Sequence, residues 1–154
     1  MSQAAALTAT VRPARREDLP DLLTLFRYLN QDPAVLPEAE ALRIWDETAA
    51  SPGISVFVAD QDARAVAMCA LIVVPNLGRG GRPIAFIENV ATLPEFQRRG
   101  FGRAVIAAAL DQAWAQNCFK VMLITGSGRP EVLAFYKALG FSEGGKTALE
   151  IRRL

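Results

Sequence analysis

The sequence predicts a mixed α/β (α+β) fold, in which helices pack on a single sheet. Two observations carry this prediction. Stretches with strand and helix patterns follow one another in the order β-α-α-β-β-β-α-β-α-β. The strands in the middle of the chain are joined by short turns, as antiparallel hairpins are, and a later helix separates two strands, as in a parallel crossover.

The first third of the chain predicts one strand followed by two helices. Residues 7–12 alternate between apolar and polar side chains, which is typical of a strand. Apolar side chains then recur at helical spacing behind acidic residues that favour a helix start; they are Leu19, Leu22, Leu23 and Phe26. Residues 30–37 predict a loop, and the proline and two glutamates that follow predict a second helix over 37–50.

The middle of the chain predicts three strands. Residues 51–53, Ser-Pro-Gly, end the second helix, and residues 54–59 predict a strand. Residues 65–74 are apolar without interruption, as in a strand that is buried on both faces. The loop 76–83 then leads to a strand over 84–93.

The last third predicts two further helices and two strands. We expect a helix over 102–116, a strand over 120–125 and a helix over 130–139, which Gly140 ends. An alternating segment over 148–154 predicts a closing strand.

Length and composition indicate one folded domain over residues 1–154. The chain is 51% hydrophobic and long enough for a full core. A net charge of +1 gives no reason to expect nucleic acid or an anionic membrane as a partner, and the longest apolar run, residues 65–74, is too short to cross a membrane. We expect the only cysteines, Cys69 and Cys118, to be reduced thiols in a cytoplasmic protein.

The sequence contains no histidine. This excludes a Ser-His-Asp or Cys-His nucleophile and a histidine-based zinc site, and two cysteines are too few for a structural zinc site. We therefore expect no metal cofactor, and acid–base chemistry that uses carboxylates, tyrosine, lysine or water.

Residues 97–102, Gln-Arg-Arg-Gly-Phe-Gly, join a predicted strand to a predicted helix. The first amides of a helix have no internal partners and carry partial positive charge, and glycines let an anion approach them. Arg98, Arg99 and Arg103 add formal charge, so the segment predicts a site for a pyrophosphate-sized anion. The alternative is a plain helix start with solvated arginines. The third glycine of the dinucleotide fingerprint is missing, which argues against a dinucleotide.

A second glycine-rich stretch, residues 140–147, has the spacing of a Walker A loop. That loop requires a strand before it and a helix after it, whereas a helix is predicted before it and only seven residues follow Thr147. We therefore favour a helix end followed by a glycine turn. A nucleotide-binding protein that uses Lys146 is the alternative.

Three motifs together resemble the GNAT superfamily of N-acetyltransferases. Gln97-x-x-Gly100-x-Gly102 is similar to its acetyl-CoA-binding signature. Residues 11–14 and 18–20 resemble its opening strand and helix, and residues 134–141, Ala-Phe-Tyr-Lys-Ala-Leu-Gly-Phe, resemble its late helix and the entry to the final hairpin. Because the motifs come in the family's order, the resemblance covers essentially the whole chain.

The resemblance implies a mostly antiparallel sheet with one splayed pair of strands, between which the pantetheine arm of acetyl-CoA lies. The arm would bond to the backbone of Val90 and Thr92, and the amide of Val90 or Ala91 would stabilise the oxyanion. The pyrophosphate would lie on the amides of residues 97–102. The implied cofactor-binding residues are Val90, Ala91, Thr92, Gln97, Arg98, Arg99, Gly100, Phe101, Gly102, Arg103 and Tyr136.

Two side chains are candidates for catalysis. Glu88 lies on the strand that would meet the cofactor, and its carboxylate could accept the proton of an amine through a water molecule. Residues 87–90 are similar to a segment of glucosamine 6-phosphate N-acetyltransferases, which carry a glutamate there; the alternative is a solvent-facing strand residue. By the same resemblance Tyr136 would donate to the leaving thiolate, and its alternative is core packing. Arg129 stands where many relatives have an asparagine that contacts pantetheine.

We therefore predict an N-acetyltransferase that moves the acetyl group of acetyl-CoA to a primary amine of a small molecule, by direct attack in a ternary complex. A protein lysine or N-terminus as acceptor, and a non-catalytic acetyl-CoA-binding or sensing module, are the alternatives. We expect the acceptor to enter between residues 28–36 and the loop 76–83, where Arg79 and Arg82 could hold an acidic group. Family members often dimerise, so we expect a homodimer.

Overall fold

The computed structural model describes residues 9–31 and 34–153. Five strands form one sheet in the order β1-β2-β3-β4-β5, and all neighbours are antiparallel except the parallel pair β4 and β5. The strands are β1 (Thr10–Pro13), β2 (Ile54–Gln61), β3 (Arg64–Val74), β4 (Ile84–Thr92) and β5 (Lys120–Met122). The predicted mixed fold with a mostly antiparallel sheet is confirmed.

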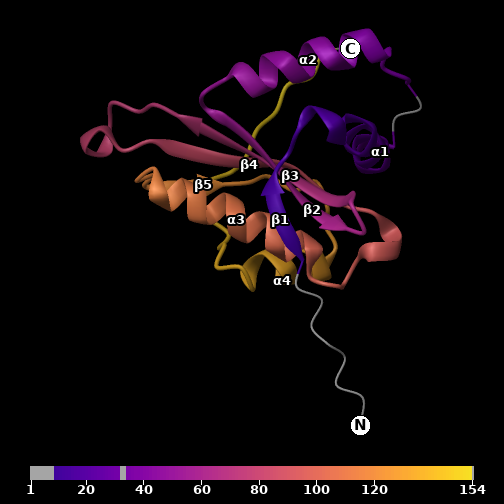
Figure 1. The fold of residues 1–154 in the computed structure, drawn as a ribbon. Coiled ribbons are helices and arrows are strands. Elements are labelled where there is room, and N and C mark those ends of the chain that lie inside the picture. The colour runs from indigo at the N-terminus through magenta and orange to yellow at the C-terminus, as the bar shows by residue number, and fades with distance from the viewer. Residues whose placement is uncertain (1–8, 32–33, 154) are drawn as a thin grey trace. The chain divides into compact units, whose positions relative to one another are not determined.

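Helices cover both faces of this sheet (Figure 1). On one face lie α1 (Leu19–Asn30) and α2 (Glu38–Ala50), and on the other lies α3 (Phe101–Ala115). Two short 3₁₀ helices, η1 (Arg16–Asp18) and η2 (Arg79–Gly81), precede α1 and β4. None of the helices in the described residues has the length and apolar character of a membrane span.

The chain divides into two compact units, Met1–Met122 and Leu123–Leu154. The first contains the sheet with α1 to α3, and the second contains α4 (Pro130–Lys137), after which Gly140 takes a φ of 95°. Residues 141–153 form neither helix nor strand, so the strand predicted over 148–154 is wrong for its described part. Alternation alone does not make a strand, because a strand also needs a neighbour that accepts its hydrogen bonds.

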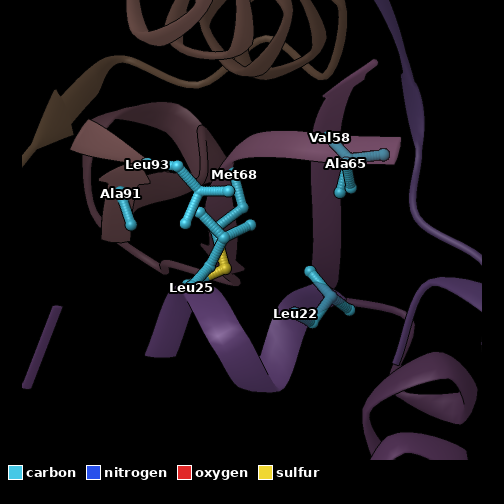
Figure 2. Close-up of a cluster of buried hydrophobic side chains, with 7 residues drawn as sticks. All are labelled: Leu22, Leu25, Val58, Ala65, Met68, Ala91 and Leu93. Atoms are coloured by element: carbon cyan, nitrogen blue, oxygen red, sulfur yellow. The ribbon is translucent and has the colours of Figure 1, made fainter. Parts of the chain in front are cut away.

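The core between α1 and the sheet fixes the end of β4. Figure 2 shows the cluster, which consists of Leu22, Leu25, Val58, Ala65, Met68, Ala91 and Leu93. Leu25 is fully buried in it, and burying a leucine side chain stabilises the fold by about 1.5–3 kcal/mol. Since Ala91 and Leu93 belong to this cluster, the segment that precedes the glycine-rich turn is held against α1.

A charged network fixes the start of α1. The Nη1 and Nη2 atoms of Arg12 each donate to a carboxylate oxygen of Asp18 at 2.7 Å, and its Nε donates to Asp60 at 2.7 Å. Asp18 also accepts the backbone N–H of Arg15 at 2.6 Å. The hydrogen bonds from Arg12 hold the pKa of the Asp18 carboxyl below its usual value. The network therefore ties β1 and η1 to β2.

Candidate active site

The chain turns sharply between β4 and α3. A short 3₁₀ helix, η3 (Pro94–Phe96), leads into a turn over residues 97–100, and α3 begins at Phe101. Arg98 and Gly100 take the left-handed conformation, with φ of 57° and 91°. Gly100 is exposed, and a Cβ at this position would have no atom within 4 Å. Glycine thus suits the backbone conformation here and leaves the main chain accessible.

The first turn of α3 presents main-chain donors together with positive charge. The first hydrogen bond of the helix joins the N–H of Ala104 to the C=O of Gly100 at 3.0 Å. The N–H groups of residues 101–103 therefore have no acceptor within the helix. Arg98, Arg99 and Arg103 are all exposed on this segment. Amide donors, a helix N-terminus and three guanidinium groups make a site that suits a diphosphate.

Aromatic packing gives Arg99 a defined place in this turn. Its guanidinium lies over the rings of Phe96 and Phe101, 5.1 and 5.5 Å from their centroids. The two rings themselves meet edge to face at 5.9 Å. The cationic group is therefore supported by η3 and α3 rather than extended freely into solvent.

The side chain of Gln97 links three elements. Its Nε2 donates to the hydroxyl of Tyr28 on α1 at 2.8 Å and to the carbonyl of Thr92 at the end of β4 at 3.3 Å. In this structure the Gln97 side chain thus positions the turn. The sequence reasoning placed Tyr28 at the expected entry of the acceptor but missed its bond to Gln97, because the two residues are far apart in the sequence.

A β-bulge interrupts β4 just before the turn. Asn89 and Val90 together face one residue of β3, Cys69, and Asn89 has a φ of 55°. A bulge leaves one residue outside the ladder and redirects the strand. The predicted backbone contacts Val90, Ala91 and Thr92 lie at this bulge or directly after it. The sequence reasoning missed the bulge, although asparagine tolerates positive φ better than most residues.

The strand β5 covers only the beginning of the other edge of β4. The parallel pairs run from Ile84 with Lys120 to Phe86 with Met122, and β5 then ends, sooner than predicted. Residues 87–92 have no strand partner on that edge among the described residues. An unpaired edge offers main-chain groups to an extended, amide-bearing ligand.

A cavity of about 790 Å³ opens beside the bulge. Its walls come from α1, the connection to α2, α2, β2 and β3, and Asn89 contributes from β4. Glu88 is exposed and is paired with Ala70, which lines the cavity. Because paired residues of antiparallel strands project to the same face, the carboxylate of Glu88 lies on the cavity side of the sheet.

Of the two segments expected to flank the acceptor, residues 30 and 34–36 line this cavity, whereas the loop 76–83 does not. Arg82 donates instead to the carbonyls of Asn117 and Cys118, at 3.2 and 3.1 Å, and Arg79 lies 5.6 Å from the ring centroid of Phe119. Arg79 and Arg82, which were expected to hold an acidic group of the acceptor, thus contact the segment 117–119 in this structure.

The second unit contains Tyr136 and Arg129. Tyr136 is half-buried in α4 and meets the rings of Phe135 and Phe141 edge to face, with centroids 5.1 and 6.1 Å away. Arg129 is the N-cap residue of α4, and its guanidinium lies 3.8 Å from Glu131. The two ring contacts pack Tyr136 within its own unit, and Arg129 lies at the start of the same helix.

The glycine-rich stretch 140–147 is not a Walker A loop. A helix precedes it, and no helix follows it in the described residues up to 153. The helix whose N-terminal amides would hold the phosphate is therefore missing from this part of the chain. Within the same described part of the chain, no group of three or more acidic or cysteine side chains could hold a metal ion.

Comparisons with known proteins agree with this geometry. The sequence model of the acetyltransferase (GNAT) family matches residues 18–141. The chain is 30% identical over 132 residues to the glucosamine 6-phosphate N-acetyltransferase of Trypanosoma brucei brucei, covering 85% of this chain and 87% of the relative. It is 27% identical over 136 residues to glucosamine 6-phosphate N-acetyltransferase 1 of Oryza sativa subsp. japonica, covering 86% and 81%.

A solved structure from Agrobacterium tumefaciens str. C58, provisionally assigned as an acetyltransferase, superposes with a TM-score of 0.89 at 44% identity and covers 94% of this chain and 99% of the other. The family model spans most of the chain, and the sheet and the glycine-rich turn occur in the order that the resemblance implied. The chain therefore belongs to the GNAT acetyltransferase family, whose members are acetyl-CoA-dependent N-acetyltransferases.

Proposed function

We propose that this enzyme transfers the acetyl group of acetyl-CoA to a primary amine of a small molecule by direct attack in a ternary complex. One observation carries the proposal: the exposed, arginine-rich turn over residues 97–100 follows β4 through the short helix η3, and the bulge of β4 borders the cavity through Asn89. A cofactor that is held at the turn and runs along the open edge of β4 would bring its thioester to the bulge.

Each part of the cofactor has a candidate partner. The pyrophosphate would bind the amides of residues 97–102 and the charges of Arg98, Arg99 and Arg103. The pantetheine arm would bond to the backbone of Val90 and Thr92 along the edge that β5 leaves open. The fit is supported by the lack of any atom near a Cβ at Gly100.

The chemistry requires a proton acceptor and a proton donor. An amine must lose a proton to attack the thioester, and the exposed carboxylate of Glu88, on the cavity side of β4, would accept it through a water molecule. The amide of Val90 or Ala91 would stabilise the oxyanion. Tyr136 would protonate the leaving thiolate, a role that rests on its place in the motif of residues 134–141.

The names of the two relatives that match over most of the chain support a small acceptor. Both are glucosamine 6-phosphate N-acetyltransferases, which act on a small amine. The homodimer, the cytoplasmic location and the single domain over residues 1–154 stay predictions.

An acetylation screen tests the proposal. The protein is incubated with acetyl-CoA and a panel of small amines, lysine peptides and free peptide N-termini, and release of CoA thiol is followed. We expect turnover with small amines, and a loss of about 10²–10⁴-fold in kcat for Glu88→Gln at pH 7. Glu17→Gln, an exposed glutamate of η1, is the matched control and should keep full activity.

Three results would count against the proposal. Binding of acetyl-CoA without turnover of any amine favours a sensing module. Turnover with peptides alone favours a protein acetyltransferase. An unchanged kcat in Glu88→Gln removes the role assigned to its carboxylate.

A further inference from the structure

The walls of the cavity are mainly apolar. Of the 22 described residues that line it, the polar ones are Thr24, Arg27, Asn30, Thr48 and Asn89. The rest include the aromatic side chains Phe26 and Trp45. A volume of about 790 Å³ is within the range of sites that enclose a small molecule. The chemistry of this lining selects among the amines that would fit by size.

The charge of the lining disfavours polycationic amines. Arg27 is the one charged side chain among the described lining residues, and it is a cation. An acceptor with several ammonium groups would find no carboxylate among the described lining residues, and only that of Glu88 at the bulge beside them. Its desolvated charges would therefore be costly.

The lining also disfavours highly hydroxylated sugars. A sugar phosphate presents many hydroxyl groups, each of which needs a partner when water is removed. Five polar side chains stand among 22 described lining residues, so most of the wall offers such groups no partner. Sugar hydroxyls against the apolar walls would lose hydrogen bonds to water without replacement.

Apolar side chains also remain exposed around the cavity. Val35, in the connection to α2, is 77% exposed, and Leu36 and Ile44 are each 40% exposed, although all three line the cavity. A hydrocarbon ligand would cover such surface and gain free energy in proportion to the area removed from water.

We propose that the acceptor is a monoamine with an apolar body, whose hydrocarbon part fills this cavity while its nitrogen lies at the bulge of β4. This inference rests on the proposed function and narrows its substrate class. Glu88 and Asn89 place a polar end beside the apolar walls, so the two ends of such an amine meet matching surroundings.

A homologous series of linear amines tests the substrate class. Burial of one methylene contributes about 0.8 kcal/mol, which corresponds to about fourfold in kcat/KM. We expect kcat/KM to rise about fourfold for each carbon from n-propylamine to n-heptylamine. Glucosamine 6-phosphate and a polycationic aminoglycoside should be poorer acceptors than n-heptylamine by at least tenfold.

A pair of variants ties this dependence to the cavity. Ile44→Glu introduces a charge into the wall and should flatten the chain-length dependence while acetyl-CoA binding stays unchanged. Val74→Glu is the control, because Val74 is 41% exposed, close to the 40% of Ile44, and does not line the cavity. In Val74→Glu, kcat/KM should rise with each added carbon as steeply as in the native enzyme.

The outcomes separate the two proposals. A preference for glucosamine 6-phosphate or the aminoglycoside overturns the inference and leaves the proposed function intact. An equal change of the chain-length dependence in Ile44→Glu and Val74→Glu has the same consequence. If no amine is acetylated, the proposed function fails, and calorimetric titration of n-hexylamine and n-heptylamine into CoA-saturated protein decides the inference. Tighter binding of the longer amine, lost in Ile44→Glu, supports it, and no binding overturns it.

Discussion

Replacing Asp18 with asparagine should measurably destabilise the fold. Asp18 is buried and accepts two hydrogen bonds of 2.7 Å from Arg12 and one of 2.6 Å from the N–H of Arg15. Asparagine keeps one acceptor oxygen and turns an NH₂ group toward a donor, so at least one charge-assisted bond is lost. Such bonds contribute about 1.5–3 kcal/mol. Because Arg12 retains Asp60, we expect a loss of about 2 kcal/mol at pH 7.

The loss depends on pH in a defined direction. The pKa of Asp18 is lowered in the folded state, so its charge stabilises the fold fully above the unfolded pKa of about 4, and this contribution disappears as the pH falls through the folded pKa. The difference between native protein and Asp18→Asn should therefore be constant from pH 7 to about pH 5 and shrink below about pH 4.

Urea unfolding of both proteins at several pH values measures this difference. At pH 7 the melting temperature should also fall by about 4–8 °C, for a chain of this length. Asp46→Asn is the control, since its pair with Arg16 is exposed and should change stability by less than about 1 kcal/mol. Equal stability of native protein and Asp18→Asn at pH 7, or a difference that stays constant down to pH 3, would refute this reasoning.

Two further predictions concern the sheet. Burial raises the pKa of the Cys69 thiol to about 12, so in a Cys118→Ser variant iodoacetamide at pH 8 should react with it only slowly until the protein is unfolded in guanidinium; rapid labelling of the folded protein would contradict this. Gly53→Ala would place a Cβ 2.6 Å from the carbonyl oxygen of Val73 and should destabilise the fold by about 1–3 kcal/mol in urea unfolding. Gly78→Ala is its control, because the nearest atom there lies at 3.5 Å, and a loss as large in this variant would remove the steric explanation.

The sequence predicted the strands and α1 of the first unit from their apolar patterns, and α2 from the proline and glutamates at its start. Residues 65–74 were expected as a doubly buried strand, and β3 spans Arg64–Val74 with helices on both faces. The closing strand over 148–154 was wrong, because alternation at Leu149 and Ile151 carries no information about whether a partner strand is available. The strand predicted over 120–125 ends early, at Met122, because the sequence does not show how far a strand stays paired with its neighbour.

The candidate site was predictable where it depends on local backbone chemistry. The glycines of the motif were expected to leave the main chain open to an anion, and Gly100 is exposed. The bond from Gln97 to Tyr28 joins residues far apart in the sequence, and the cavity brings together side chains from α1, α2 and three strands. Such features follow from tertiary packing, which no local pattern encodes. The bulge at Asn89 lies between these cases, since its signal is one residue type.

The affinity for acetyl-CoA in a matched pair of glycine variants tests the binding site most directly. Gly100→Glu and Gly80→Glu both put a glutamate at an exposed glycine with positive φ, 91° and 69°, where a Cβ meets no atom within 4 Å. Backbone strain is present in both variants and is larger at Gly100, because its φ and ψ of 91° and −5° lie further from the left-handed region than the 69° and 28° of Gly80. Only Gly100 lies in the turn over residues 97–100, where we propose that the diphosphate binds. We expect calorimetric titration to show at least about tenfold weaker binding for Gly100→Glu, from repulsion between its carboxylate and the diphosphate, and native affinity for Gly80→Glu. Native affinity in Gly100→Glu, or an equal loss in both variants, would place the diphosphate elsewhere.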